Sequence, residues 1–122
     1  MSKEYSFPAT SRLRKKKDFQ KVYAHGRVFT DNDGVLYVFA RPSPQEKTRI
    51  GIAAGKKLGG AVIRNQMKRR MRETYRLCQS TIKPGWDLLW IARRSLLGAR
   101  FAVFLATFCR LAKRAGIYGV IK

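Results

Sequence analysis

The sequence predicts a single α+β domain whose elements follow the order helix, three strands, helix, strand, helix. Short segments rich in β-branched and aromatic residues indicate strands, whereas two longer segments repeat apolar residues every three or four positions, as helices do. Turn-forming and helix-breaking residues separate these segments. Since the chain has 122 residues and shows no linker or internal repeat, we expect one domain over residues 1–122.

The N-terminal segment is predicted to be an extended, basic arm followed by a short helix. Residues 1–17 contain Pro8 and a run of cations without an apolar pattern. A helix over 18–24 should follow, with Asp18 in its first turn, where a negative charge is favourable. Gly26 should then end this helix in a left-handed conformation.

Three strands are expected next, over residues 27–30, 35–41 and 49–54. The connections at 31–34 and 42–47 are short and rich in turn residues, so they predict an antiparallel meander. The middle strand is apolar at both its odd and its even positions. Both of its faces should therefore be covered at least in part.

The C-terminal half is predicted to contain a helix over about 61–80, a strand over 86–92 and a helix over 97–115. The strand–helix–strand unit over 49–92 can form a parallel crossover. A wide apolar stripe on the last helix is typical of core packing.

The charge balance indicates a polyanionic partner. The chain has 27 Lys and Arg residues against 7 Asp and Glu residues, a formal net charge of +20. Nucleic acid is the usual partner of so basic a domain. No segment approaches the roughly 20 apolar residues of a membrane helix, and the N-terminus lacks the apolar core of a signal peptide. Cys78 and Cys109 fit neither a zinc motif nor a disulfide framework. We therefore expect a cytoplasmic protein.

The helix over 61–80 is predicted to have two sides. Its apolar side runs from Ile63 to Cys78 through Met67 and Met71 and should face a core. The basic side is suited to successive phosphates and carries Asn65, Lys68, Arg69, Arg72 and Arg76, with Arg64 at its border and Lys56 and Lys57 just before the helix. A solvated basic face and a membrane-surface helix are weaker alternatives, since the apolar side is rich in Met, Thr and Cys.

Aromatic residues next to cations form a second candidate site. Phe19 and Tyr23 on the first helix and Tyr37 on the middle strand accompany Lys21 and Arg27. Aromatic rings with a basic rim hold single-stranded nucleic acid by stacking and charge. The pattern alone is equally compatible with rings that belong to the core.

No pattern of catalytic side chains is evident. His25 is the only histidine, and the glycine-rich segment 55–60 lacks the spacing of a phosphate-binding loop. Asp31 and Asp33 could bind a metal, but their spacing before Gly34 is more typical of a turn. The side chains therefore predict a protein that does not catalyse a reaction by itself, and they identify no metal ligand. A protein-only nuclease would need clustered carboxylates or histidines.

Three segments together resemble one known family. The most specific is Arg64-Asn65-x-x-Lys68-Arg69-x-x-Arg72-Glu73, preceded by Lys56-Lys57-Leu58-Gly59-x-Ala61-Val62. The other two are residues 12–23 with Gly26-Arg27, and Val35-Leu36-Tyr37. In order and spacing, over roughly residues 12–95, they resemble the bacterial ribonuclease P protein subunit. The sequence departs from the family pattern at Gly34, where a bulky residue is common, and at Gly55, where serine is common.

The resemblance implies a fold and an activity. The fold would be a compact αβββαβα domain with helices packed on a four-stranded sheet and an unusual left-handed βαβ crossover. The holoenzyme would remove the 5′ leader of precursor tRNA by Mg²⁺-dependent hydrolysis of one phosphodiester. Its catalyst would be the RNA subunit, which would also hold most of the Mg²⁺, so the protein alone would be inactive. A structural RNA-binding protein, such as a ribosomal protein, is the alternative.

The resemblance also implies roles for individual residues, none of them catalytic. Contacts with the RNA subunit would come from Arg64, Asn65, Lys68, Arg69 and Arg72, to which the basic pattern adds Lys56, Lys57 and Arg76. The leader would contact Phe19, Tyr23 and Tyr37, with Lys21 and Arg27 close by. The N-terminal arm would contact phosphates through Arg12, Arg14, Lys15, Lys16 and Lys17.

Overall fold

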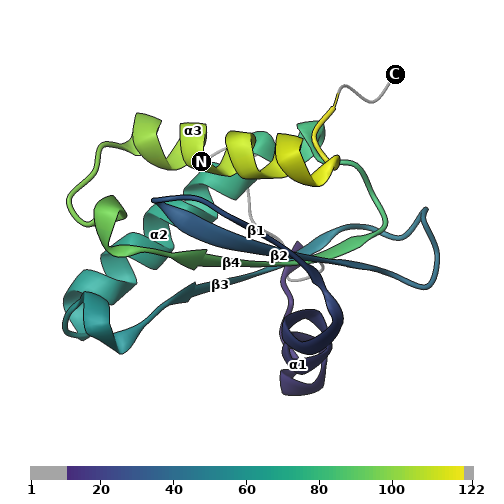
Figure 1. Ribbon diagram of the computed structural model, residues 1–122, viewed down its shortest axis with the longest axis horizontal. Helices are drawn as coiled ribbons and strands as arrows, with labels where there is room; N and C mark the ends of the chain where they lie inside the picture. The colour runs from purple at the N-terminus through teal and green to yellow at the C-terminus, as the bar shows by residue number, and fades with distance from the viewer. Residues whose placement is uncertain (1–10, 120–122) are drawn as a thin grey trace, which may run out of the picture.

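The structure is a computed structural model and describes residues 11–119. Within that range, the helices and strands follow the predicted αβββαβα order. They form three layers with the sheet in the middle (Figure 1). The elements are α1 (Lys16–His25), β1 (Arg27–Thr30), β2 (Gly34–Ala40), β3 (Arg49–Ala54), α2 (Ala61–Cys78), β4 (Trp86–Ala92) and α3 (Phe101–Ala115). Helices α2 and α3 cover one face of the sheet, and α1 lies against the other.

The strand order is β1-β2-β4-β3, so the predicted meander is wrong at its second connection. Strand β4 lies between β2 and β3, antiparallel to β2 and parallel to β3. The physical reason is burial: four consecutive β4 residues, Asp87–Trp90, are buried, so this strand gains most from a central position. The parallel crossover from β3 through α2 to β4 is confirmed. Its left-handed sense stays a prediction.

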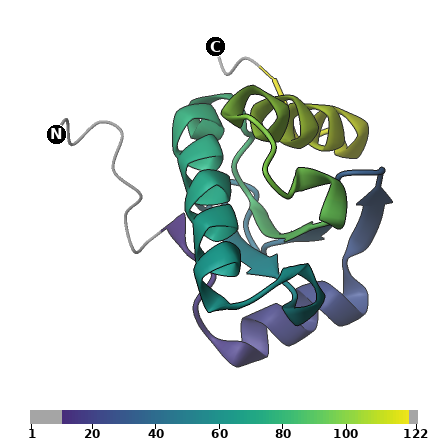
Figure 2. The ribbon, with the colours of Figure 1, turned by 90° about the vertical axis from the view of Figure 1, so that its left-hand side faces the viewer.

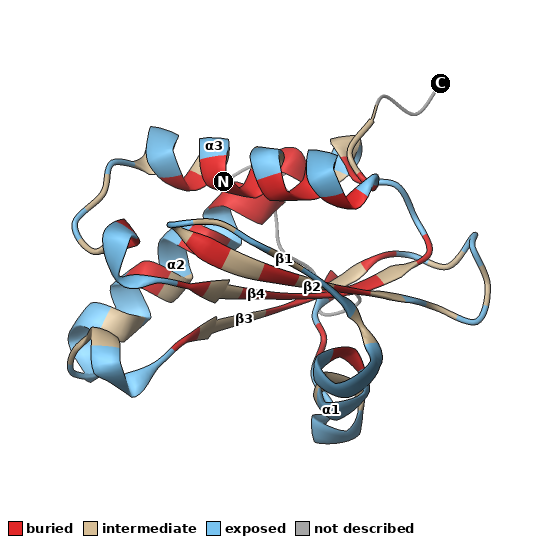
Figure 3. Ribbon diagram, in the orientation of Figure 1, coloured by how far each residue is buried: buried red, intermediate tan, exposed pale blue. Residues whose placement is uncertain are grey.

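The sheet face under α2 and α3 holds the main core. Leu36 and Val38 of β2 and Leu88 and Trp90 of β4 are buried there. Figure 3 shows buried segments, in red, along β2 and β4 and on the side of α3 that faces the sheet. The ring of Phe108 on α3 packs on Trp90, with ring centroids 4.9 Å apart. On its other side it meets the edge of Tyr75 from α2, at 5.8 Å and 89°. These ring contacts join both helices to the sheet.

The opposite face is only partly covered. Helix α1 crosses it and buries Val22 against Leu13 and Leu89. Phe19 packs so closely on β3 that a Cβ at Gly51 would lie 2.2 Å from the Phe19 ring. A side chain at position 51 would therefore displace the Phe19 ring from the sheet.

The N-terminal segment differs from the predicted extended arm. Lys16 and Lys17 form the first turn of α1. Before them, Leu13 is buried, and its backbone N–H donates to the carbonyl oxygen of Ile50 at 2.9 Å. This segment therefore lies against the edge of β3. Residues 1–10 of the predicted arm lie outside the described residues.

Two glycines have roles that differ from the sequence expectation. Gly26 has φ −72°, so the predicted left-handed cap is wrong. It approaches the preceding helix instead: a Cβ there would lie 2.5 Å from the carbonyl oxygen of Val22. Gly34 stands where the family commonly has a bulky residue. A Cβ at this position would lie 3.1 Å from the Trp90 indole nitrogen. The large indole under this strand end leaves little room for a bulky residue.

Helix α3 begins four residues later than predicted, at Phe101 rather than Leu97. Residues 94–96 form a 3₁₀ turn instead, and Gly98 follows it with a positive φ of 67°. A glycine in this conformation is a poor continuation of a helix. The chain thus changes direction before α3 starts.

Candidate nucleic-acid interface

Helix α2 has the two sides that the sequence predicts. Met67, Met71 and Cys78 are buried, together with Thr74 and Tyr75. Ile63 is the exception on the apolar side, since 43% of it is exposed. The predicted contacts Asn65, Arg69 and Arg72 are exposed, and Arg64, Lys68 and Arg76 are intermediate. Figure 2 shows that α2 runs along the outside of the molecule, so its basic side faces solvent.

The cations of α2 differ in how they are held. Arg76 pairs with Glu73 one turn earlier, at 2.9 Å. Arg64 Nε donates to the carbonyl oxygen of Gly59 at 3.2 Å, which fixes its side chain over the turn before the helix. Within residues 11–119, no carboxylate pairs with Lys68, Arg69 or Arg72. The middle of α2 therefore carries uncompensated positive charge.

Two further cations, which the sequence analysis missed, lie at the same end of the sheet as Lys56 and Lys57. The parallel register sets Ala54 of β3 beside Ala92 of β4, so both strands end together. Lys56 and Lys57 follow β3, and Arg93 and Arg94 follow β4. Arg93 Nη1 donates to the carbonyl oxygen of Asp31 at 2.8 Å. Lys56, Lys57 and Arg94 are exposed. In the sequence, each of the two parallel strands is followed by a pair of cations. This pattern indicates a common basic site only when it is known that β3 and β4 lie side by side.

The aromatic residues of α1 and β2 come together as predicted. The rings of Tyr23 and Tyr37 stack with centroids 5.1 Å apart and planes inclined by 28°. Tyr23 is the outer ring, with 62% of it exposed. Burial and the neighbouring Tyr23 hydroxyl raise the pKa of Tyr37 above its ordinary value. Phe19 and Leu89 line an open hollow beside Tyr23. Because the two tyrosines are already stacked on each other, only the outer face of Tyr23 offers a platform for another ring.

The two cations predicted beside these rings lie apart from each other. Lys21 is exposed on α1 and borders a second hollow, which Phe39 and Arg41 also line. Arg27 lies on β1 with its guanidinium over the ring of Phe29, 5.1 Å from the centroid. Phe29 packs against the core under α2 and α3. The structure therefore does not bring Arg27 to the Tyr23–Tyr37 pair.

An ion cluster centred on Arg49 joins α1 to the sheet. Arg49 Nε and Nη2 donate to the two carboxylate oxygens of Asp87 at 2.8 and 2.7 Å. Arg49 also pairs with Asp18 of α1 at 3.5 Å. The hydrogen bond with Asp87 is the main cause that raises the pKa of the Arg49 guanidinium. This ion cluster therefore joins α1, β3 and β4.

The acidic turn between β1 and β2 has a structural role. Asp31 Oδ1 accepts the N–H groups of Asp33 and Gly34 at 2.8 and 3.0 Å, which confirms the turn interpretation. Arg110 of α3 pairs with Asp31 and Asp33 at 2.9 and 3.1 Å. The Ser95 hydroxyl, which donates to Asp33, is the main cause that lowers the pKa of this carboxyl. These two carboxylates thus fasten the turn to α3.

Neither a metal centre nor a membrane helix is found in the described part of the chain. No three His, Cys, Asp or Glu side chains gather there into a possible metal site. The six carboxylates described all pair with arginines. No helix among residues 11–119 is long and apolar enough to cross a membrane.

Comparisons with known proteins identify the family to which the chain is similar. The sequence model of the family "Ribonuclease P" matches residues 7–116. The ribonuclease P protein component of Clostridioides difficile is 39% identical over 112 residues, covering 91% of this chain and 96% of that protein. Its counterpart in Roseiflexus castenholzii is 40% identical over 107 residues, covering 87% and 86%.

Solved structures extend the match to the fold. The RNase P protein of Staphylococcus aureus superimposes with a TM-score of 0.78 at 29% identity, covering 89% of this chain and 98% of that one. That of Thermotoga maritima gives 0.76 at 28% identity, covering 84% and 96%. The chain therefore belongs to the family of bacterial ribonuclease P protein components, the subunits that assist removal of the 5′ leader from precursor tRNA.

Proposed function

We propose that two separate surfaces of this subunit bind the two RNAs of the reaction. The basic side of α2, together with Lys56 and Lys57, binds the catalytic RNA. The Tyr23 surface, which comprises Phe19, Tyr23 and Tyr37, binds the single-stranded 5′ leader. The observation that carries this proposal is the separation of uncompensated cations on α2 from exposed, stacked rings beside α1.

The contact with the catalytic RNA rests on charge and spacing. Lys68, Arg69 and Arg72 follow one another within little more than one helical turn, a rise of about 6 Å, and successive phosphates are spaced on that scale. Arginine can form two parallel hydrogen bonds with a phosphate. Asn65 lies in the same row but is neutral, so its amide is suited to a ribose or a base edge. Arg64 and Arg76 flank the row, and Lys56, Lys57 and Arg94 extend it past the start of α2.

The contact with the leader rests on stacking. A base can lie on the outer face of Tyr23 and extend the stack that Tyr23 and Tyr37 already form. Phe19, which packs on Gly51, forms an apolar floor next to that position. Lys21 is exposed on the same helix and can hold a leader phosphate. Arg27 contacts the leader only from the edge of β1, since its side chain covers Phe29.

The N-terminal cations add phosphate contacts on the same side of the molecule as α1. They are all exposed and run from the edge of β3 into the first turn of α1: Arg12, Arg14, Lys15, Lys16 and Lys17. Since they begin next to the sheet and end beside the leader surface, they can follow the backbone of an RNA that approaches it.

The Mg²⁺ of the reaction is assigned chiefly to the RNA. In the described part of the protein, the carboxylates pair with arginines and form no cluster, so these residues do not fit a resident metal ion. Because its RNA partner and precursor tRNA are made in the cytoplasm, we place the protein there as well.

Reconstitution tests the proposed function. The purified protein should cleave no precursor tRNA alone, and it should strongly raise cleavage by ribonuclease P RNA at low Mg²⁺ concentration. A double variant of the α2 row, Arg69→Ala with Arg72→Ala, should lose most of this stimulation. If that double variant stimulated cleavage as well as the unmodified protein, the basic side of α2 would not be the RNA-binding surface.

A further inference from the structure

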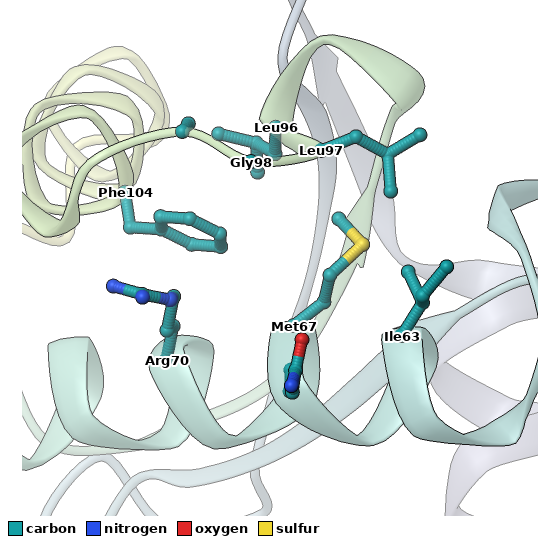
Figure 4. A pocket seen from close by; sticks show the side chains of 9 residues that line it. Ile63, Met67, Arg70, Leu96, Leu97, Gly98 and Phe104 are labelled. Atoms are coloured by element: carbon teal, nitrogen blue, oxygen red, sulfur yellow. The ribbon is translucent and has the colours of Figure 1, made fainter.

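A groove beside α2 belongs to neither of the two surfaces above. It lies between the first half of α2 and the connection from β4 to α3 (Figure 4). Its floor is apolar and buried, formed by Met67, Leu96 and Phe104. Its mouth is apolar as well but open to solvent, since Ile63 is exposed and Leu97 is only half-buried.

The rim of the groove is polar and positively charged. Gln66 and Arg70 line both this groove and an adjoining hollow, to which Arg69, Phe101 and Glu73 also contribute, the last of them paired with Arg76. Figure 4 shows the Arg70 guanidinium beside the Phe104 ring, at the entrance. Among the residues that the structure describes, neither the Gln66 amide nor the Arg70 guanidinium has a hydrogen-bond or ion-pair partner. Both groups are thus available to a ligand.

We propose that this groove receives an unpaired nucleobase of the ribonuclease P RNA, with an adjacent phosphate on Arg69 or Arg70. The base lies on the apolar mouth beside Ile63 and Leu97, and the Gln66 amide bonds to its edge. The inference rests on the proposed contact between the basic side of α2 and this RNA, and it adds a site for a single base to a surface otherwise suited to phosphates.

Position and charge favour RNA over other occupants. Gln66 and Arg70 each follow a residue of the basic side by one position, a rotation of about 100° around the helix. An RNA strand whose phosphate is bound by Arg69 therefore passes next to the groove. A second copy of this chain is disfavoured, because each copy has a formal net charge of +20 and the rim is itself cationic. A guanidinium and an amide at the mouth also suit a base edge better than a purely apolar ligand.

Photo-crosslinking in the reconstituted holoenzyme tests the site directly. The crosslinking residue p-benzoylphenylalanine replaces Ile63 or Leu97 in separate proteins. It replaces Lys68 as a comparator on the basic side and Val103 as an exposed control outside the groove. Reverse transcription of the RNA maps each crosslinked nucleotide. We expect positions 63 and 97 to crosslink to the same unpaired nucleotide, position 68 to a neighbouring backbone segment, and position 103 to nothing.

The other outcomes separate this inference from the proposed function. Crosslinks from position 68 without any from 63 and 97 would overturn the groove site and leave RNA binding by α2 intact. No crosslink from 63, 68 or 97 would overturn both. Crosslinks from 63 and 97 to base-paired nucleotides, or to a second protein copy, would also overturn the groove site.

An affinity measurement gives a second, independent readout. Arg70→Gln should weaken binding of ribonuclease P RNA about tenfold, the scale of one lost charge-assisted contact with a phosphate. It should also restore chemical reactivity at the nucleotide identified by crosslinking. Arg100→Gln removes an equally exposed arginine close to the groove but outside its lining, and should change neither. If both variants weakened RNA binding equally, Arg70 would act only through its positive charge, and the proposed base site would be overturned.

Discussion

The two faces of the sheet are built from the same strands but are completed in different ways. Under α2 and α3, Leu36, Leu88 and Trp90 are fully buried. On the α1 side, Tyr37 and Ile91 of the same strands remain half-buried, and Leu89 is buried because α1 crosses it. One face thus supplies the stability of the fold. The other keeps apolar and aromatic surface available for a ligand, which a sealed core could not do.

The two faces also differ in what joins the helices to them. Rings of α2, α3 and β4 interlock on the sealed face. On the open face, α1 is held by a smaller apolar contact together with the ion cluster of Asp18, Arg49 and Asp87. The structural prediction is that mutations in the sealed core and in the ion cluster lower stability, whereas those at the exposed ring of Tyr23 mainly lower leader binding.

The largest loss of stability should come from the sealed face. Phe108→Ala removes the ring between Trp90 and Tyr75 and leaves a cavity, so the free energy of unfolding should fall by about 4 kcal/mol. Urea unfolding followed by circular dichroism measures this. Tyr23→Ala, at the exposed ring of the open face, should cost less than about 1 kcal/mol. Similar costs for both variants would contradict the division between the faces.

The ion cluster should contribute the next largest effect. Asp87→Asn removes the carboxylate that accepts two hydrogen bonds from Arg49, and we expect a loss of about 2 kcal/mol, the value of charge-assisted hydrogen bonds at a part-buried site. Glu73→Gln is the matched control. It removes a pair with Arg76 in which the carboxylate is 49% exposed, so urea unfolding should show a loss below about 1 kcal/mol. If the two substitutions cost the same, the pair between Arg49 and Asp87 would contribute no more to stability than a surface ion pair.

Leader binding should separate the faces in the opposite direction. Tyr23→Ala should weaken holoenzyme binding of precursor tRNA by about 1–3 kcal/mol, since one stacked base would lose its platform. Binding of mature tRNA, which lacks the leader, should not change. Val62→Ala, a similarly exposed apolar residue on α2, serves as control. A loss that is equal for precursor and mature tRNA would show that Tyr23 does not contact the leader.

Substitutions on the exposed, basic side of α2 should lower RNA affinity without lowering the stability of the core, which the buried side of the helix covers. Arg69→Ala or Arg72→Ala should each reduce the slope of log K against log salt for ribonuclease P RNA by about 0.9, the value of one phosphate contact. Unfolding free energy should stay within about 0.5 kcal/mol of the unmodified protein. The slope is measured by filter binding over a salt series. A residue whose removal leaves the slope unchanged does not contact a phosphate.

The smallest expected effect concerns the turn that fastens the sheet to α3. Because the folded-state pKa of Asp33 is lowered from its ordinary 3.8, its stabilisation is full above that pH and is lost as the pH falls below it. Asp33→Asn should therefore lower stability at neutral pH by roughly 1 kcal/mol, the value of hydrogen bonds to a charged group at a partly exposed site. The difference from the unmodified protein should shrink below pH 3.8. Thermal unfolding at both pH values measures it, and a difference that persists in acid would assign the effect to another cause.

Local patterns predicted each helix and strand, but not the order of the strands. The turn at Asp31 and the two sides of α2 depend on neighbouring residues, and both are confirmed. The insertion of β4 between β2 and β3 depends on burial of a segment distant in sequence, which no local pattern encodes. For the same reason, the proximity of Arg94 to Lys56 was not predicted. The aromatic and basic pattern grouped Tyr23 with Tyr37 as a candidate site, and the resemblance to the family favoured a role in leader binding over a place in the core. Their mutual stacking could be seen only in the structure.

The position of β4 also has a consequence for the way the chain folds during synthesis. Strand β3 pairs with β4 and not with the strand that precedes it, so its neighbour in the sheet is absent until residues 86–92 have left the ribosome. Until then, β1 and β2 can form a hairpin, but the sheet cannot close. Pairings between distant segments are slow to form. Helix α2, with its row of cations, is therefore translated before the strand that completes the sheet beneath it.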